Sequence, residues 1–316
     1  MLDLMVYEGM GAPGTLYPDD NVMLSRSAWA GSQRYGSAVW SGDTSSTFSD
    51  LNQQFRAGLN IVMSGIPYWT TDIGGYNGGN ISDPGFRELI VRWFQWGAVC
   101  PIFRNHGRRD GGAHPPDDSG PCGRTGASNE IWEFGNESEA AIARAMRLRD
   151  QLRPYVMEQY RLAATDGAPV MRPLFYDFWE DRTAQRVDDQ LMFGPLYLVA
   201  PQLHEQATSR SVYLPQLPAG ELWSNLFTLA QYNTTAGSLN ITEATPLTGD
   251  GFGTFPIYRR HPATPYPPPS PPPTPIPLPL PKCDVTCVVA PGTERATGGR
   301  MTQHFNSSDT AECCAK

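Results

Sequence analysis

Three clusters of polar and aromatic residues stand out between residues 25 and 106, and they read Trp40-Ser41-Gly42-Asp43, Trp69-Thr70-Thr71-Asp72-Ile73-Gly74-Gly75-Tyr76 and Arg104-Asn105-His106. Each cluster follows a short apolar run and contains a carboxylate or a cationic side chain. Barrels of parallel strands place their working groups at the carboxyl ends of such runs. This stretch therefore decides the fold and is also where we expect a site.

Strand-like and helix-like patterns alternate around these clusters. Residues 22–30, 37–40 and 61–66 are apolar runs typical of buried strands. A helical pattern begins at Phe48, after hydroxyl side chains at residues 44–47 that can cap it. A second helix is predicted from Ser82-Asp83-Pro84, where proline occupies the first turn. The alternation predicts parallel strands joined by right-handed crossovers, as in a barrel or a doubly wound sheet.

The pattern changes further along the chain. A long helical pattern covers residues 136–164, with an interruption or kink at Pro154. Residues 170–178, 191–200 and 211–214 then read as strands punctuated by proline and glycine, which indicates a small β-sandwich.

The last part of the chain differs again in composition. Proline occupies more than half of residues 262–281, a composition typical of an extended spacer. Four cysteines follow within residues 283–316, which predicts a small module stapled by disulfides.

Composition limits the possible partners. With 316 residues, of which 40% are hydrophobic and 11% aromatic, the chain can bury a sizeable core. A formal net charge of -8 argues against nucleic acid and against an anionic membrane surface, since both attract clustered Lys and Arg. No apolar run approaches the roughly 18 residues of a membrane span, and the first residues lack the pattern of a secretion signal. The sequence nevertheless favours a secretory or extracellular context, with a signal outside this chain, because it holds a cysteine-rich tail and sequons at Asn80, Asn136, Asn233, Asn240 and Asn306.

Several long motifs, taken together and in order, resemble glycoside hydrolase family 31, the retaining α-glucosidase and α-xylosidase family. Besides the three clusters, the matching text includes Leu24-Ser25-Arg26-Ser27, Ala30-Gly31-Ser32-Gln33-Arg34-Tyr35, Arg92-Trp93-Phe94-Gln95, Pro169-Val170-Met171-Arg172-Pro173-Leu174-Phe175 and Asp189-Gln190-Leu191-Met192-Phe193-Gly194-Pro195. The resemblance covers about residues 4–258. The tail from Cys283 resembles the opening of an Apple/PAN-like domain.

The resemblance implies an α/β fold, the C-terminal half of a (β/α)8 TIM barrel followed by a small all-β sandwich domain and a proline-rich tail. We expect four segments, which are a partial catalytic barrel at residues 1–178, a proximal β-sandwich at 179–260, a proline-rich linker at 261–282 and the cysteine-rich module at 283–316. The resemblance also implies a retaining α-glycosidase that removes terminal α-linked glucose from oligosaccharides or glycans. An α-xylosidase stays open, because the two sugars differ by one hydroxymethyl group.

The resemblance identifies Asp43 as the general acid/base. The positions that match the family's sugar-binding subsite are Arg26, Trp40, Asp72, Tyr76, Arg104 and His106. No metal ion or organic cofactor is expected, because proton transfer and covalent catalysis need neither.

Each of these residues also has an ordinary structural interpretation. Asp43 is placed to cap the helix that follows it, and Asp72 to lie in a simple turn. A lone histidine such as His106 more often has a structural role than a ligand-binding one. Trp40 and Tyr76 could pack in the core and not against a sugar. In the catalytic interpretation Asp43 must hold a proton near neutral pH, which a negative nucleophile opposite it favours and Arg26 opposes.

Retaining hydrolysis needs a second carboxyl group about 5 Å from the first. In the family this nucleophile is an aspartate in a Trp-x-Asp-x-x-Glu-like stretch upstream of the acid/base. None of the acidic residues before Asp43, namely Asp3, Glu8, Asp19 and Asp20, stands in such a context. We therefore expect the nucleophile to lie outside this chain and the chain alone to be inactive. A non-catalytic carbohydrate-binding or scaffold protein is the alternative.

Overall fold

In the computed structural model, the described chain forms three short parallel strands, two within the apolar runs at 22–30 and 37–40 and one just after the run at 61–66. They are β1 (Met23–Ser25), β2 (Ser37–Trp40) and β3 (Trp69–Thr70), paired in the order β1-β2-β3. Helix α2 (Phe48–Met63) connects β2 to β3, and α3 (Pro84–Gly97) follows β3. A parallel bridge between Ile73 and Asn105 extends the arrangement to the segment after α3. The predicted alternation of parallel strands and helices is therefore confirmed.

The structure describes residues 22–110 and 128–261, all within a unit that spans residues 1–272. The proline-rich segment from residue 262 and the cysteine-rich module at 283–316 lie outside the described residues. The further helices and strands of the described part are η1 (Ser32–Tyr35), η2 (Ile131–Phe134), α4 (Asn136–Gln151), α5 (Arg153–Asp166), β4 (Met171–Pro173), α6 (Leu174–Asp177), η3 (Ala184–Arg186), β5 (Leu191–Phe193), β6 (Tyr197–Val199), β7 (Ser209–Leu214), β8 (Leu222–Asn225), β9 (Gln231–Tyr232), β10 (Leu239–Ala244), α7 (Gly249–Phe252) and β11 (Ile257–His261).

Side-chain caps fix where the first two helices begin. The Thr47 hydroxyl accepts a hydrogen bond from the Asp50 N–H at 3.0 Å, so Thr47 is the N-cap of α2. Asp83 caps α3 by accepting from the N–H of Gly85 at 3.1 Å, and Pro84 occupies the first turn. Both predicted helix starts are confirmed, and Asp43 caps neither helix.

Between the first two parallel strands and the sandwich, one predicted strand is absent and one predicted helix interruption is present. The strand expected at residues 61–66 is wrong, because Ile61 to Met63 form the last turn of α2. Val62 is buried and continues the apolar helix face that includes Leu59, so the helical period overrides β-branched propensity. The interruption predicted at Pro154 in the helical pattern of residues 136–164 is confirmed, because the pattern forms α4 and α5 with Pro154 in the first turn of α5, where a missing N–H costs little.

Two antiparallel sheets make up the C-terminal part of the described chain. One contains six strands in the order β4-β5-β6-β11-β8-β9, and the other pairs β10 with β7. A turn at Gly194 divides the run 191–200 into β5 and β6, while the run 170–178 forms β4 and then the short helix α6. Since β4 pairs with β5, the antiparallel sheet begins before the boundary expected at residue 178.

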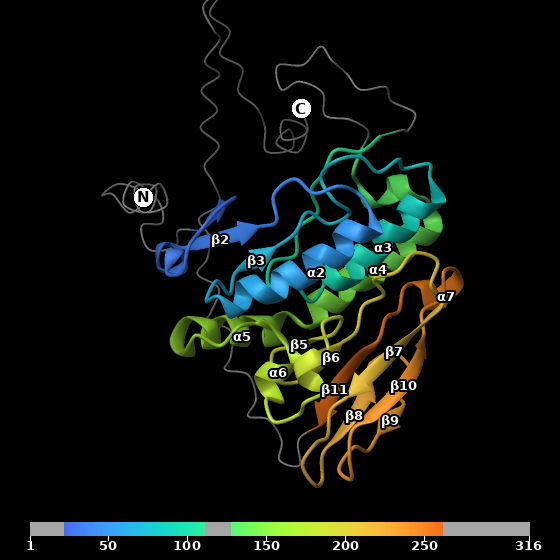
Figure 1. Cartoon of the computed structure of the whole chain (residues 1–316). Coiled ribbons are helices and arrows are strands. Elements are labelled where there is room, and N and C mark those ends of the chain that lie inside the picture. Colours follow the sequence, from blue (N-terminus) through green and yellow to red (C-terminus); the bar gives the residue numbers. More distant parts are fainter. Residues whose placement is uncertain (1–21, 111–127, 262–316) are drawn as a thin grey trace, which may run out of the picture. The chain divides into compact units, whose positions relative to one another are not determined.

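The six-stranded sheet buries both of its faces. Leu191 and Phe193 of β5 belong to a core that includes the barrel helices, whereas Met192 belongs to a second core with Trp223 and Tyr258. This alternation follows from the two-residue period of a strand. Helix α2 contacts both β3 and β4, and Figure 1 shows it between the parallel strands and the antiparallel sheet.

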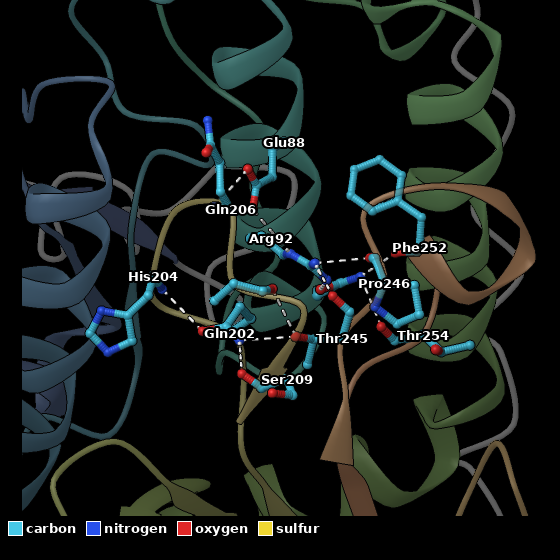
Figure 2. Close-up of polar contacts among 12 residues, drawn as sticks. Glu88, Arg92, Gln202, His204, Gln206, Ser209, Thr245, Pro246, Phe252 and Thr254 are labelled. Atoms are coloured by element: carbon cyan, nitrogen blue, oxygen red, sulfur yellow. Dashed lines mark hydrogen bonds and ion pairs between the residues drawn. The ribbon is translucent and has the colours of Figure 1, made fainter. Parts of the chain in front are cut away.

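Buried polar side chains of α3 join the helix to the sandwich. Arg92 is fully buried and donates through Nη2 to the carbonyl oxygens of Thr245 (2.8 Å) and Pro246 (3.0 Å). One turn earlier, both carboxylate oxygens of Glu88 accept from the N–H of Gln206 at 3.1 Å. Figure 2 shows these side chains reaching from the helix to two loops of the sandwich. The packing of helix on sheet is thereby fixed by hydrogen bonds as well as by apolar contact.

Within the described ranges, no helix combines the length and the apolar character that crossing a membrane requires.

Candidate active site

Asp43 lies just beyond the carboxyl end of β2. Its Oδ2 is 3.4 Å from Nη1 of Arg26, which follows β1, and both side chains are partly exposed. Between them, Gly42 has a φ of +75°, and a Cβ at this position would be 3.3 Å from Nε of Arg26. Glycine therefore permits the turn that brings Asp43 beside the guanidinium. Because Thr47 caps α2, Asp43 stays free of the capping role that the sequence left open.

Asp72 follows β3 and is fully buried, with its Oδ1 paired to Nη1 of Arg104. Burial raises the pKa of this carboxyl, while the charges of Arg104 and His106 act in the opposite direction and that of Asp43 adds to the increase. Its second oxygen, Oδ2, is buried and has no hydrogen-bond partner among the described residues. A turn aspartate is normally solvated, so this is a different environment from the structural alternative.

Aromatic rings surround the Asp72 and Arg104 pair. The Arg104 guanidinium lies 5.8 Å from the centre of the Trp40 ring, and the rings of Tyr76 and His106 are 5.4 Å apart and tilted by 33°. Nε1 of Trp40 is a second buried polar atom without a partner in the described part of the chain. Unpaired polar atoms are uncommon in protein interiors, and two of those in the described chain lie beside Arg104.

The seven predicted site residues thus come together, some just beyond the carboxyl ends of β1, β2 and β3 and the others on the segment bridged to them at Asn105. The electrostatic influence of Asp43, Arg104 and His106 on Asp72 shows that the groups of different strands share one neighbourhood. By contrast, Trp69, Trp93 and Trp96 are buried in the core. The roles of the seven residues in binding and catalysis remain predictions.

Sequence reasoning missed Arg109, which organises the loop that carries Tyr76. Arg109 is fully buried and donates to the carbonyl oxygens of Ile73 (2.9 Å) and Gly75 (2.7 Å) and to Oδ1 of Asn129 (2.7 Å). Its guanidinium also lies over the ring of Phe86. The only local signal was a position three residues beyond His106, because the carbonyls that it binds are about 35 residues away in sequence.

Loop glycines allow the same segment to pack closely. Gly75 has a φ of +76°, and a Cβ there would come within 2.6 Å of the Ser45 carbonyl oxygen. A parallel bridge joins Ser45 to Asn77, and the N–H of Tyr76 donates to the Thr44 carbonyl oxygen at 2.8 Å. The loop after β3 is therefore anchored directly on the loop that contains Asp43.

Comparison with known proteins identifies the architecture. Residues 4–159 match the model of the glycosyl hydrolases family 31 TIM-barrel domain, and residues 167–263 match the glycosyl hydrolase family 31 C-terminal domain. Together the two models cover most of the described chain. The predicted fold class, a partial TIM barrel followed by a β-sandwich, is confirmed.

Individual relatives come from both sugar specificities. The chain is 39% identical over 207 residues to an α-xylosidase of Saccharolobus solfataricus (66% of this chain, 26% of the relative). It is 33% identical over 238 residues to neutral α-glucosidase C of Mus musculus (75% of this chain, 23% of the relative). The structure of a family 31 α-xylosidase from a soil metagenome, in complex with xylose, matches with a TM-score of 0.73 and 46% identity over 82% of this chain and 36% of that one. The chain spans about a quarter of the length of these curated relatives, and it belongs to glycosyl hydrolase family 31.

Proposed function

We propose that the protein containing this chain is a retaining α-glycosidase that removes terminal α-linked glucose from oligosaccharides or glycans. The observation that carries the proposal is the position of Asp43, partly exposed at the end of β2 and beside the buried pair of Asp72 and Arg104. Family membership supports the same reaction class.

In this reaction Asp43 donates its proton to the glycosidic oxygen while the bond to the anomeric carbon breaks. A carboxylate nucleophile attacks that carbon and forms a covalent glycosyl-enzyme. Asp43, now a base, then takes a proton from water, whose oxygen displaces the nucleophile and releases the sugar with its configuration retained. Asp72 is unsuited to the attack because it is buried and its Oδ1 is held by Arg104. We assign the nucleophile to a residue outside the described part of the chain.

The remaining site residues bind the sugar in this proposal. Asp72 accepts from a sugar hydroxyl through its unpaired Oδ2 once a local shift of the loop exposes that atom, and Arg104 donates to a neighbouring hydroxyl. Trp40 and Tyr76 offer apolar ring faces to the C–H side of the sugar. His106 is exposed beside Tyr76 and donates from a ring nitrogen.

An α-xylosidase is the second candidate. The matched α-xylosidase structure is 46% identical in sequence to this chain over 82% of the chain. Xylose lacks the hydroxymethyl group of glucose, so the two functions require different space at one position of the same subsite. The discrimination therefore has to be measured on both sugars.

The test is release of nitrophenol from aryl α-glucoside and aryl α-xyloside, by the chain alone and by the protein with any upstream coding sequence restored. The longer protein should turn over one of the two substrates, and Asp43→Asn should lower its kcat by about 100-fold to 10,000-fold, the usual contribution of general acid-base catalysis. The matched control is Asp188→Asn, because Asp188 is an exposed partner of Arg56 on another surface. Activity of Asp43→Asn within a factor of ten of the parent protein would reject the assignment.

We also propose passage through the secretory pathway. The asparagine is exposed in each of the four sequons that the structure describes, namely Asn80, Asn136, Asn233 and Asn240. Material secreted from a eukaryotic host should lose mass on treatment with an N-glycan amidase. Unchanged mass would contradict the proposal.

A further inference from the structure

An exposed tryptophan lies on the sandwich, away from the residues around Asp43. Trp179 is 69% exposed, and Phe175 and Tyr176, just before it, are 38% and 40% exposed. Large aromatic side chains normally contribute to stability by burial, so three exposed rings within five residues form an unusual surface. Such patches commonly mark places where another molecule binds.

The turn that carries Trp179 is held in place by hydrogen bonds. The Trp179 carbonyl oxygen accepts from Nε2 of Gln185 at 2.6 Å, and the N–H of Asp181 donates to the Phe178 carbonyl oxygen at 3.1 Å. Asp181 in turn accepts from the hydroxyl of Tyr213 at 2.5 Å. The ring is therefore presented to solvent from a fixed backbone, and little conformational entropy is lost when a ligand binds to it.

The ring borders a hollow of about 620 Å³, within the range of small-molecule sites. Its lining is mainly polar and includes Glu180, Gln216, Ser238 and Arg260. Glu180 makes no hydrogen bond or ion pair with any described residue, and Arg260 uses Nε for Glu221 at 2.5 Å, which leaves its terminal nitrogens available. The lining thus offers both acceptors and donors together with an aromatic ring.

The charges of the lining restrict the ligand. Asp177 is paired with Arg172 and Arg260 with Glu221, so Glu180 and Asp181 leave the lining negative and a phosphate or another anion is disfavoured. A purely apolar ligand would leave the carboxylate and guanidinium groups without solvent or partners. A sugar combines a C–H face that fits an aromatic ring with hydroxyls that pair with carboxylate, amide and guanidinium groups. We propose that this hollow, which we call the Trp179 hollow, is a second oligosaccharide-binding site separate from the site at Asp43.

The test uses the full chain labelled with 5-fluorotryptophan and followed by ¹⁹F NMR during titration with isomaltotriose and with maltotriose. The chain has eight tryptophans, and the resonance missing from the Trp179→Phe variant identifies the ring of interest. That resonance should shift and saturate with at least one sugar. The resonance of Trp132, which is also exposed (61%) but lies in η2 and outside the hollow, should not move.

Variants then test the chemistry. Trp179→Ala should weaken the binding measured by calorimetry by about 30-fold, as expected for loss of an aromatic anchor. Glu180→Gln should weaken it less, while Trp132→Ala should leave this binding unchanged. Because the measurement is binding and not turnover, failure of the proposed glycosidase activity does not affect it.

Three results would overturn the inference. One is the absence of a saturable shift of the Trp179 resonance with both sugars. Another is equal affinity of Trp179→Ala and the parent chain. The third is a shift produced only by a synthetic peptide of residues 262–281, which would make the Trp179 hollow a polyproline-binding surface instead.

Discussion

Replacing Arg92 with methionine tests whether the hydrogen bonds of α3 hold the barrel and the sandwich together. Arg92 has no exposed surface, and its Nη2 donates to the carbonyl oxygens of Thr245 and Pro246. Burial lowers the pKa of the guanidinium to about 10, which still leaves it charged at neutral pH. The change therefore removes a charged donor from two carbonyls and a cation from the neighbourhood of Glu88, 3.9 Å away.

The magnitude follows from what is left behind. Each buried carbonyl that loses its donor costs about 1–3 kcal/mol, and removing one partner of a buried ion pair costs about 3–5 kcal/mol. Both costs describe the loss of the same guanidinium, so we do not add them. The Gln206 N–H still binds the Glu88 carboxylate and methionine fills part of the vacated volume, so we take the lower end of the range of about 3–5 kcal/mol. We expect a loss of about 3 kcal/mol in the free energy of unfolding, or about 10 °C in Tm for a chain of this size.

The assay is thermal unfolding followed by circular dichroism at pH 7. Arg56→Met is the matched control, because Arg56 forms an exposed ion pair with Asp188 that should contribute less than about 1 kcal/mol. Adding Glu88→Gln to Arg92→Met should recover part of the loss, since the carboxylate would no longer be buried without its cation. If Arg92→Met and Arg56→Met melt within 2 °C of each other, the hydrogen bonds of Arg92 do not stabilise this packing.

Two further predictions concern the loop after β3 and the pH dependence of stability. In an active longer protein, Arg109→Lys should lower kcat/KM by about 100-fold, because lysine cannot hold several loop carbonyls at once and small misplacements of a site have effects of this size. The control is Arg108→Lys, since Arg108 is exposed. Equal activities of the two variants would refute the positioning role of Arg109. Burial raises the pKa of Glu88 above its ordinary value of 4.5, so the folded state holds this proton more tightly than the unfolded state does. The corresponding stability is present below pH 4.5 and is lost as the pH rises through the raised pKa. Glu88→Gln should therefore gain in Tm relative to the parent chain between pH 4 and about pH 7, and a constant difference in Tm across this range would contradict the prediction.

The sequence predicted the elements whose signals are local. Thr47 and Asp83 mark the starts of α2 and α3, because their short side chains accept hydrogen bonds from N–H groups two or three residues later. The strand predicted at 61–66 failed because a β-branched run continued the buried face of α2, a preference that depends on what packs against the helix. The interruption predicted at Pro154 is confirmed, because α4 ends at Gln151 and α5 begins at Arg153 with Pro154 in its first turn.

The candidate site was predicted by resemblance more than by pattern. Asp43 and Asp72 follow the parallel neighbours β2 and β3, and a parallel bridge between Ile73 and Asn105 brings His106 to the same place, so this neighbourhood depends on long-range pairing. The contributions of Arg92 and Arg109 were missed, since each binds carbonyl groups far away in the sequence. Carbonyls are present at every residue, so no spacing of side chains could identify those partners.

The six-stranded sheet has a consequence for exchanging parts between family members. Its alternate residues belong to two different cores, so one face of the sheet packs against the barrel helices and the other against the small two-stranded sheet. A sandwich transplanted from a relative would bring new side chains to both faces of the six-stranded sheet at once. Leu191 and Phe193 would have to be kept or replaced together with the facing residues of the helices. The natural unit of recombination is therefore the sandwich together with helices α2 to α5, and a chimera joined at the start of the sheet should fold poorly.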